Sequence, residues 1–290
     1  MKLSVIIPAY IEPYLQRTVD SLLENSDLGG DLEVFVVLDG PRAGIRPVAN
    51  DPRLKVLELG MHQGMRACFN AGLSFVSGKY IMKADAHCAF GPAFDRIMVE
   101  DCEENMVMVP RRYALDEATW GPDKKKMGRD YHYLNYPVPA GDAYECSMTP
   151  HFWGVRGNSI VIDEIMTYQG SCWMADYEYF MRLAGPLDDH PSTYGPFWGE
   201  QLEVGLKYWL GGGRVVVNKA AWYAHLFKQP RHYDSGDFER EDKGSCMINR
   251  HWSTRHWLHD LEPNMIHPFS WLVEKFWPVP TWPADRKEWK

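Results

Sequence analysis

The chain has 290 residues, 45% of them hydrophobic, which is enough for a sizeable core in one large domain or two small ones. Its formal net charge of −8 argues against a generally cationic protein that binds nucleic acid. No apolar run reaches the roughly 18 residues of a membrane span, and the first apolar run, residues 3–8, is too short for a secretory signal. The six cysteines lack CxxC spacing and fit reduced thiols. We therefore expect a soluble, cytoplasmic protein, in the host cytoplasm if the source is a virus.

The first 84 residues alternate between strand and helix patterns. Residues 3–7 form an apolar run that stops at Pro8, and residues 13–25 follow with apolar side chains at helical spacing. Strands are then predicted over 33–38 and 54–59, a helix over 64–77, and a strand over 79–84. This order predicts an α/β fold with an open, mostly parallel sheet and flanking helices.

Polar or turn residues follow three of these strands, at Pro8-Ala9-Tyr10, Asp39-Gly40 and Asp85-Ala86-His87. Because ligand sites of open α/β sheets lie beyond the carboxyl ends of the strands, we expect these segments to meet along one edge, where a nucleotide would bind. Asp85 and His87 are two residues apart, so in extended chain they point to the same side and could bind a divalent metal. A surface turn is the alternative for this pair.

Four segments, SVIIPAYIEPYLQRTVDSLL, VVLDG, GMRACFNAG and GKYIMKADAH, resemble in order and spacing the nucleotide-sugar half of GT-A fold, family 2 type glycosyltransferases. Two further details resemble the polypeptide N-acetylgalactosaminyltransferases: the Asp-x-His-Cys motif at 85–88, and FWGEQLEVGLKYWLGGG, which is similar to that family's Trp-Gly-Gly-Glu-Asn segment. The resemblance implies a Rossmann-like GT-A domain over 1–228, with a nucleotide-sugar half (1–112) and an acceptor half (113–228). Residues 229–290 would form an aromatic and basic extension packed on the domain.

The resemblance implies a UDP-sugar donor and a divalent metal bound by Asp85, His87 and His225. Imidazole is a softer donor than oxygen, so Mn²⁺ suits this set better than Mg²⁺. The cation would stabilise the negative charge that builds on the departing diphosphate. Taken alone, a histidine such as His225 is more often a core or surface residue than a metal ligand.

The resemblance also implies a donor pocket at the strand ends. Pro8, Tyr10 and Glu12 would contact the base and ribose, Asp39 would bind the uracil or its ribose, and Arg66 would neutralise the diphosphate or shape the pocket. A plain turn at Asp39 and a solvated helix residue at Arg66 are the alternatives.

Candidate catalytic residues lie at the start of a helix predicted from Glu200 to the glycines at 211–213. Glu200, Gln201 and Trp198 are expected beside the cleft, although Glu200 could instead be a favourable helix-dipole partner. The segment departs from the family at three positions. Phe197 stands where the family has tryptophan, Trp198 stands where it has the first glycine, and Gln201 stands where it has Asn. The metal motif also departs from the family, because Ala89 replaces the acidic residue that follows the cysteine. N-acetylgalactosamine is therefore not assumed as the sugar. The likeness implies retention of anomeric configuration without a protein base, whereas in inverting relatives Glu200 would be the base.

The acceptor is expected to be a hydroxyl on a macromolecule, either Ser/Thr of a protein or a hydroxymethylated base of viral DNA. Cationic and aromatic residues of the C-terminal region favour the second: Arg231, His232, Arg240, Lys243, Arg250, His251, Trp252, Arg255, His256 and Trp257. They equally fit a helical tail that packs its aromatic side chains on the domain. An inverting enzyme of polysaccharide or glycolipid synthesis and a non-catalytic nucleotide-sugar binding module are the other possibilities, and the oligomeric state is left open.

Overall fold

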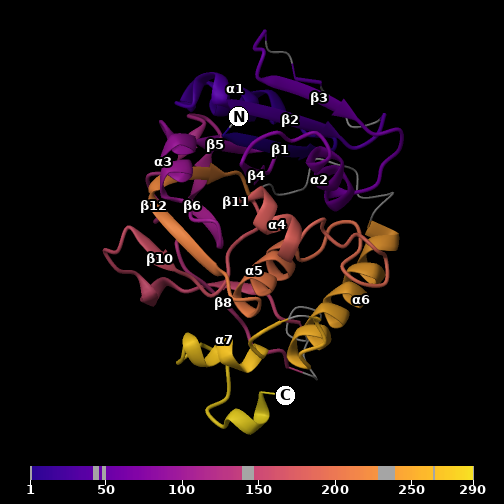
Figure 1. Ribbon diagram of the computed structural model, residues 1–290, viewed down its shortest axis with the longest axis vertical. Helices are drawn as coiled ribbons and strands as arrows, with labels where there is room; N and C mark the ends of the chain where they lie inside the picture. The colour runs from indigo at the N-terminus through magenta and orange to yellow at the C-terminus, as the bar shows by residue number, and fades with distance from the viewer. Residues whose placement is uncertain are drawn as a thin grey trace.

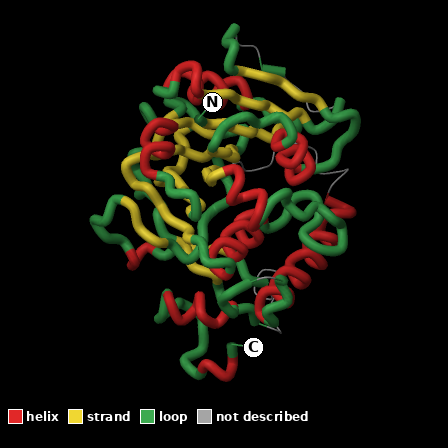
Figure 2. Tube along the Cα trace, in the orientation of Figure 1, coloured by secondary structure: helices red, strands yellow, loops and turns green. Residues whose placement is uncertain are grey.

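A computed structural model of the chain describes residues 2–41, 46–47, 50–138, 147–227, 239–263 and 265–289, with side chains between 239 and 247 left out. Its centre is a ten-stranded sheet (Figures 1 and 2). The spatial order is β10 (Ile162–Glu164), β12 (Arg214–His225), β6 (Met106–Asp116), β11 (Cys172–Asp176), β4 (Tyr80–Ala84), β1 (Leu3–Ala9), β2 (Leu32–Leu38) and β3 (Leu54–Glu58); β5 (Cys88–Phe90) pairs with β12 and β7 (Gly121–Pro122) with β6.

The strands predicted in the first 84 residues are confirmed as neighbours in this sheet. β1 pairs in parallel with both β2 and β4, and β2 pairs in parallel with β3. Nearly every side chain of β1, β2 and β4 is buried, which explains why these strands read as continuous apolar runs rather than alternating ones.

Helices cover both faces of the sheet. On one face, α1 (Leu15–Asn25) and α3 (Phe94–Asp101) pack against alternate residues of the strands. On the other, α2 (Met65–Leu73), α4 (Tyr177–Leu183) and α5 (Glu200–Leu210) pack into the larger core. The predicted helix over 64–77 was too long: the backbone N–H of Ser77 donates to the Glu33 carboxylate at 2.7 Å, which ties the chain to β2 soon after α2 ends.

The half of the sheet that contains β11, β6 and β12 is mixed rather than purely parallel. β6 and β12 run parallel, and β11 is inserted antiparallel between β6 and β4. A separate hairpin-like pair consists of β8 (His132–Leu134) and β9 (Pro150–Phe152). Short 3-10 turns lie at Gly29–Asp31, Gly154–Arg156 and Arg286–Glu288.

The C-terminal helices α6 (Glu239–Leu258) and α7 (Phe269–Lys275) lie at the end of the molecule opposite β3 (Figure 1). Aromatic side chains of these helices and of the segment after α7 enter the same core as Trp209 of α5: Trp257, Phe269, Phe276, Trp282 and Trp289 are all buried there. The predicted division at residue 228 falls outside the described residues and stays a prediction.

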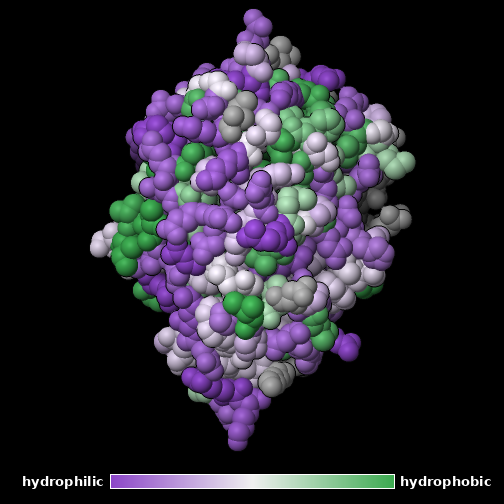
Figure 3. Space-filling model, in the orientation of Figure 1, coloured by the Kyte–Doolittle hydropathy of each residue, from purple (hydrophilic) through white to green (hydrophobic). Residues whose placement is uncertain are grey.

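The surface in Figure 3 is mainly hydrophilic, with a hydrophobic patch at its left edge, where β10 lies in Figure 1. Exposed apolar residues near β10 are Val155, Ile160 and Val161. Among the described residues, no helix is both long and apolar enough to span a membrane. The described cysteines Cys68, Cys88, Cys102 and Cys172 are free and buried.

Candidate active site

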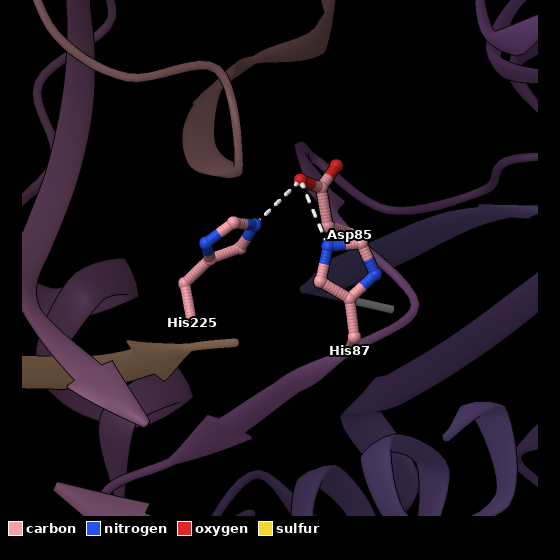
Figure 4. Close-up of side chains that lie close together, drawn as sticks. All are labelled: Asp85, His87 and His225. Carbon is pink, nitrogen blue, oxygen red and sulfur yellow. Dashed lines mark hydrogen bonds and ion pairs between the residues drawn. The ribbon is translucent and has the colours of Figure 1, made fainter. Parts of the chain in front are cut away.

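Three side chains of metal-ligand type meet at the strand ends. Asp85 follows β4, His87 precedes β5, and His225 is the last residue of β12. Because β5 pairs antiparallel with β12, with Cys88 opposite His225, the two histidines are brought to the same place. One ligand atom from each of the three residues lies within 4.8 Å of the other two. His225 Nε2 is 3.2 Å and His87 Nε2 4.0 Å from Asp85 Oδ2, so both rings face one carboxylate (Figure 4).

Glu12 contacts the ring nitrogen of His87 that faces away from Asp85. Its Oε2 lies 2.9 Å from His87 Nδ1, and its Oε1 accepts the backbone N–H of Tyr14 at 3.1 Å. Glu12 is 5% exposed. The predicted contact of Glu12 with the base and ribose stays a prediction, and the structure shows instead that its carboxylate contacts an imidazole. A carboxylate on the far nitrogen of a histidine is the usual support of a metal-ligating ring.

His225 is held as a neutral imidazole. Burial lowers its pKa to about 4, and this outweighs the opposing effect of the hydrogen bond with Asp85. Its Nδ1 is buried and has no hydrogen-bond partner in the part of the chain that the structure describes. The neutral ring is the form that binds metals.

Lys83, which sequence reasoning missed, joins this cluster to the start of α5. It is 3% exposed, and its Nζ forms ion pairs with Asp85 Oδ1 and, at 3.2 Å, with Glu200 Oε1. The carbonyl oxygen of Gly170 accepts a third hydrogen bond at 2.8 Å. Burial alone would raise the pKa of Asp85, but Lys83 and the two histidines hold it well below its usual range. The sequence feature that could have identified Lys83 is that it is the single charged residue of an otherwise apolar strand.

Glu200 is the first residue of α5 and is 4% exposed. Besides Lys83, its carboxylate accepts a hydrogen bond from Trp173 Nε1 at 3.0 Å. Burial raises the pKa of Glu200, with Lys83 opposing. A Cβ at Gly170 would come within 2.9 Å of the Glu200 carboxylate, so a larger residue there would displace this carboxylate. Gln201 follows as the second, half-buried residue of the helix.

Arg66 lies inside the protein rather than on the surface of α2. It has no exposed surface, and its guanidinium is bound by the Glu203 carboxylate and by the carbonyl oxygens of Trp198 and Asp188. Direct neutralisation of a diphosphate by Arg66 is therefore contradicted, because none of its donors faces open space. The alternative, that Arg66 shapes the pocket, agrees with the two hydrogen bonds that its guanidinium donates to the Trp198 carbonyl oxygen.

Trp198 points its indole toward α6. Its Nε1 donates to Ser253 Oγ at 3.3 Å, and the Arg250 guanidinium lies 4.0 Å from the centre of one of its rings. The side chain is partly buried in the larger core. The indole of Trp198, which has no counterpart in the family motif, thus packs mainly against α6.

The ends of β1 and β2 meet as predicted, since the Asp39 backbone N–H donates to the Ala9 carbonyl at 2.9 Å. Pro8 is half-buried just before this contact. The Asp39 carboxylate is itself bound by the backbone N–H groups of Gln63 (2.7 Å) and Gly64 (2.9 Å) and lies 2.7 Å from His62 Nδ1.

His62 also stacks on Tyr10, with ring centroids 4.0 Å apart. Sequence reasoning missed His62, which sits in a loop without a recognisable pattern. A stacked aromatic pair at the strand ends is the kind of surface on which a base can lie.

The C-terminal residues considered for DNA binding are only partly described: Arg231 and His232, and the side chains of Arg240 and Lys243, lie outside the described residues. Trp257 has no exposed surface and donates to Tyr194 Oη at 2.8 Å, so the expectation that it stacks on a base is wrong. Trp252 packs edge-on against Tyr194 and stacks on His256.

The chain is similar to known proteins in both sequence and fold. Residues 4–183 match the family model described as glycosyl transferase family 2. Polypeptide N-acetylgalactosaminyltransferase 4 of Mus musculus is 23% identical over 81% of this chain and 41% of its own length, and polypeptide N-acetylgalactosaminyltransferase 10 of Homo sapiens is 24% identical over 78% and 38%. The chain thus spans about two fifths of the length of these curated relatives. The crystal structure of GalNAc-T7 with UDP, GalNAc and Mn²⁺ superposes with a TM-score of 0.58 at 15% identity, over 79% of this chain and 44% of that one, which shows a shared fold.

Proposed function

Because the chain belongs to glycosyl transferase family 2, we propose that it moves a sugar from a UDP-sugar to a hydroxyl group of a macromolecular acceptor. The observation that carries the proposal is the convergence of Asp85, His87 and His225 at the carboxyl ends of the strands. One carboxylate and two imidazoles suit Mn²⁺, and a bound cation would stabilise the charge that develops on the departing diphosphate. The UDP and Mn²⁺ of the GalNAc-T7 structure support the same pairing of nucleotide and metal.

Each protein group has a defined task in this proposal. Asp85, His87 and His225 hold the metal, and Glu12 fixes the ring of His87. Lys83 keeps Asp85 ionised and in place. The stacked Tyr10 and His62 rings offer a surface for the uracil, and Asp39 contacts His62. Pro8 lies near the end of β1.

We propose further that transfer retains the anomeric configuration. The acceptor oxygen bonds to the anomeric carbon as the bond from that carbon to the diphosphate oxygen breaks, and the hydroxyl proton passes to the departing diphosphate. The state of Glu200 supports this route, because its carboxylate is already bound by Lys83 and Trp173 rather than open to a hydroxyl. An inverting reaction with Glu200 as the base is the competing possibility, and the NMR assignment of the product anomer distinguishes the two.

For the acceptor, we propose a protein Ser or Thr hydroxyl, which the names of the relatives support. A hydroxymethylated DNA base is less favoured because Trp257 is buried and Trp252 is packed against Tyr194 and His256. A non-catalytic nucleotide-sugar module would not need three convergent metal ligands.

The test is UDP release from a panel of UDP-sugars, with Mn²⁺ or EDTA, in the presence of Ser/Thr peptides or hydroxymethylcytosine DNA. Turnover should require the metal and should be lost in His87→Ala but kept in His259→Ala, a change at an exposed histidine at the end of α6. If no UDP-sugar binds or reacts with any metal, the proposed function is wrong.

A further inference from the structure

A small polar hollow lies beside the metal-ligand cluster, between β6, β12 and residues 165–169. Its polar lining consists of Arg112, Arg129, Asp130, His132, Tyr168, Gln169 and Tyr223. The free space, about 10 Å³ for the centre of a water-sized group, is roughly the room of one bound water or one oxygen atom of a larger group. No residue named for metal, donor or catalysis above belongs to this lining.

Arg112 is a buried cation without a counter-ion among the described residues. It is 3% exposed, and its Nε and Nη1 have no hydrogen-bond partner in that part of the chain. Its Nη2 faces His132 Nε2 at 3.4 Å, and burial lowers the pKa of His132 to about 3, so this neighbour is neutral. Asp130 also lines the hollow, but its two carboxylate oxygens are bound by Arg111 at 2.8 and 2.7 Å. Burying a guanidinium without a counter-ion and with two unpaired nitrogen atoms lowers the stability of the fold. This arrangement points to a site that binds an anion.

Other donors converge on the same space. Tyr168 Oη is buried and has no partner in the described part of the chain. Arg129 is exposed, and its guanidinium lies 5.9 Å from the ring of Phe227, while that of Arg112 lies 5.1 Å from the same ring. Two guanidinium groups and a phenol, with the one carboxylate of the lining already paired with Arg111, form an environment for an oxyanion.

The hollow is a neighbour of the metal-ligand cluster. The ring of Phe227, which both arginines approach, is 5.0 Å from that of His225. Tyr223, opposite Arg112 in the sheet, shares a hydrogen bond of 2.7 Å with Ser171 Oγ, and the Ser171 carbonyl accepts the backbone N–H of Asp85 at 2.8 Å. Arg112 is therefore connected to the metal-ligand residue His225 through a single side chain, that of Phe227.

We propose that this hollow receives one oxygen atom of an oxyanion group, a carboxylate or a phosphate, carried by the acceptor close to the hydroxyl that receives the sugar. Its location as an acceptor subsite rests on the proposed function, whereas anion binding itself does not. An acidic or phosphorylated side chain near the modified Ser or Thr supplies this chemistry.

The experiment measures thermal unfolding of the full chain in EDTA, titrated with inorganic phosphate, acetate or chloride at constant ionic strength. Phosphate or acetate should raise the melting temperature of the wild type more than chloride does, and the preferred anion identifies the group. Removal of a charge-assisted hydrogen bond should weaken the apparent affinity by about ten-fold or more in Arg112→Met and Arg129→Gln. Arg129 is exposed, so Arg129→Gln should fold even if Arg112→Met does not, and it then provides the test by itself. The matched control is Arg182→Gln, an exposed arginine on α4.

Equal effects of all three anions on the wild type would mean that the hollow holds water only, and would overturn the inference. The inference also fails if both arginine variants respond to phosphate and acetate like Arg182→Gln, since the anion then binds elsewhere. Mn²⁺-dependent UDP binding to the wild type, measured separately by calorimetry, tests the proposed function. The two proposals can therefore fail independently.

Discussion

Replacing Lys83 by methionine tests the link between the metal-ligand cluster and α5. The change removes the one cation that contacts both Asp85 and Glu200 among the described residues, two carboxylates that are 25% and 5% exposed in their side chains. Breaking a buried ion pair by removing one partner costs roughly 3–5 kcal/mol. For a chain of this size, that corresponds to a fall in melting temperature on the order of 10 °C in EDTA.

Mn²⁺ should partly reverse this loss. A divalent cation at Asp85 replaces the missing positive charge and no longer meets repulsion from Lys83, so the variant should bind Mn²⁺ more tightly than the wild type. Saturating Mn²⁺ should then raise the melting temperature of Lys83→Met by more than it raises that of the wild type. The assay is thermal unfolding in EDTA and across a Mn²⁺ titration.

Lys207→Met is the matched control, because Lys207 pairs at 2.9 Å with the buried carboxylate of Glu203. Its stabilisation by Mn²⁺ should equal that of the wild type. If Lys83→Met also gains the wild-type increment, or if it is as stable as the wild type in EDTA, then Lys83 does not act through Asp85 and the reasoning is wrong.

Individual contacts support three further predictions. Glu12→Gln should weaken Mn²⁺ binding by about 10–100-fold while leaving the fold intact, because it removes the charge that orients His87; calorimetry measures this. Arg66→Met should lower the free energy of unfolding by about 3–5 kcal/mol in a denaturant titration, because a fully buried ion pair with Glu203 is broken. Lowering the pH from 7 to 5 should cost the wild type about 2 kcal/mol through His132, since its pKa is depressed in the folded state and only the unfolded chain takes up the proton; His132→Gln should lose correspondingly less.

Each of these predictions has a result that contradicts it. Wild-type Mn²⁺ affinity in Glu12→Gln would show that the ring of His87 is not positioned by that carboxylate. A stability loss below about 1 kcal/mol in Arg66→Met would mean that Glu203 is satisfied by Lys207 and the backbone alone. Parallel pH profiles for His132→Gln and the wild type would show that this ring is not buried neutral.

The parts of the fold that follow from local patterns were predictable from the sequence. The strands β1, β2 and β4 are apolar runs buried on both faces, and α5 has apolar residues at helical spacing followed by three glycines. Residues that directly follow such strands could also be assigned to the ligand-binding edge of the sheet. Asp85 and His87 could therefore be identified as candidate metal ligands from the sequence. His225 needed the resemblance, because β12 carries no pattern that singles out its last residue.

Contacts between distant segments explain what could not be predicted. Lys83 and Glu200 are 117 positions apart, and Arg66 and Glu203 are 137 positions apart. A sequence pattern reports the face on which a side chain lies but not its partner across the core, so Arg66 was expected at a diphosphate although it meets a buried carboxylate. The sequence nevertheless carries one usable sign of such sites. Lys83 and Arg112 are both cations in the middle of strands that are otherwise largely apolar, and a buried charge is tolerated only where a partner or a ligand meets it. For Lys83 the structure supplies the partners. For Arg112 the described residues supply the neutral ring of His132 but no counter-ion, and that difference is the reason to expect a ligand at Arg112 rather than another internal ion pair.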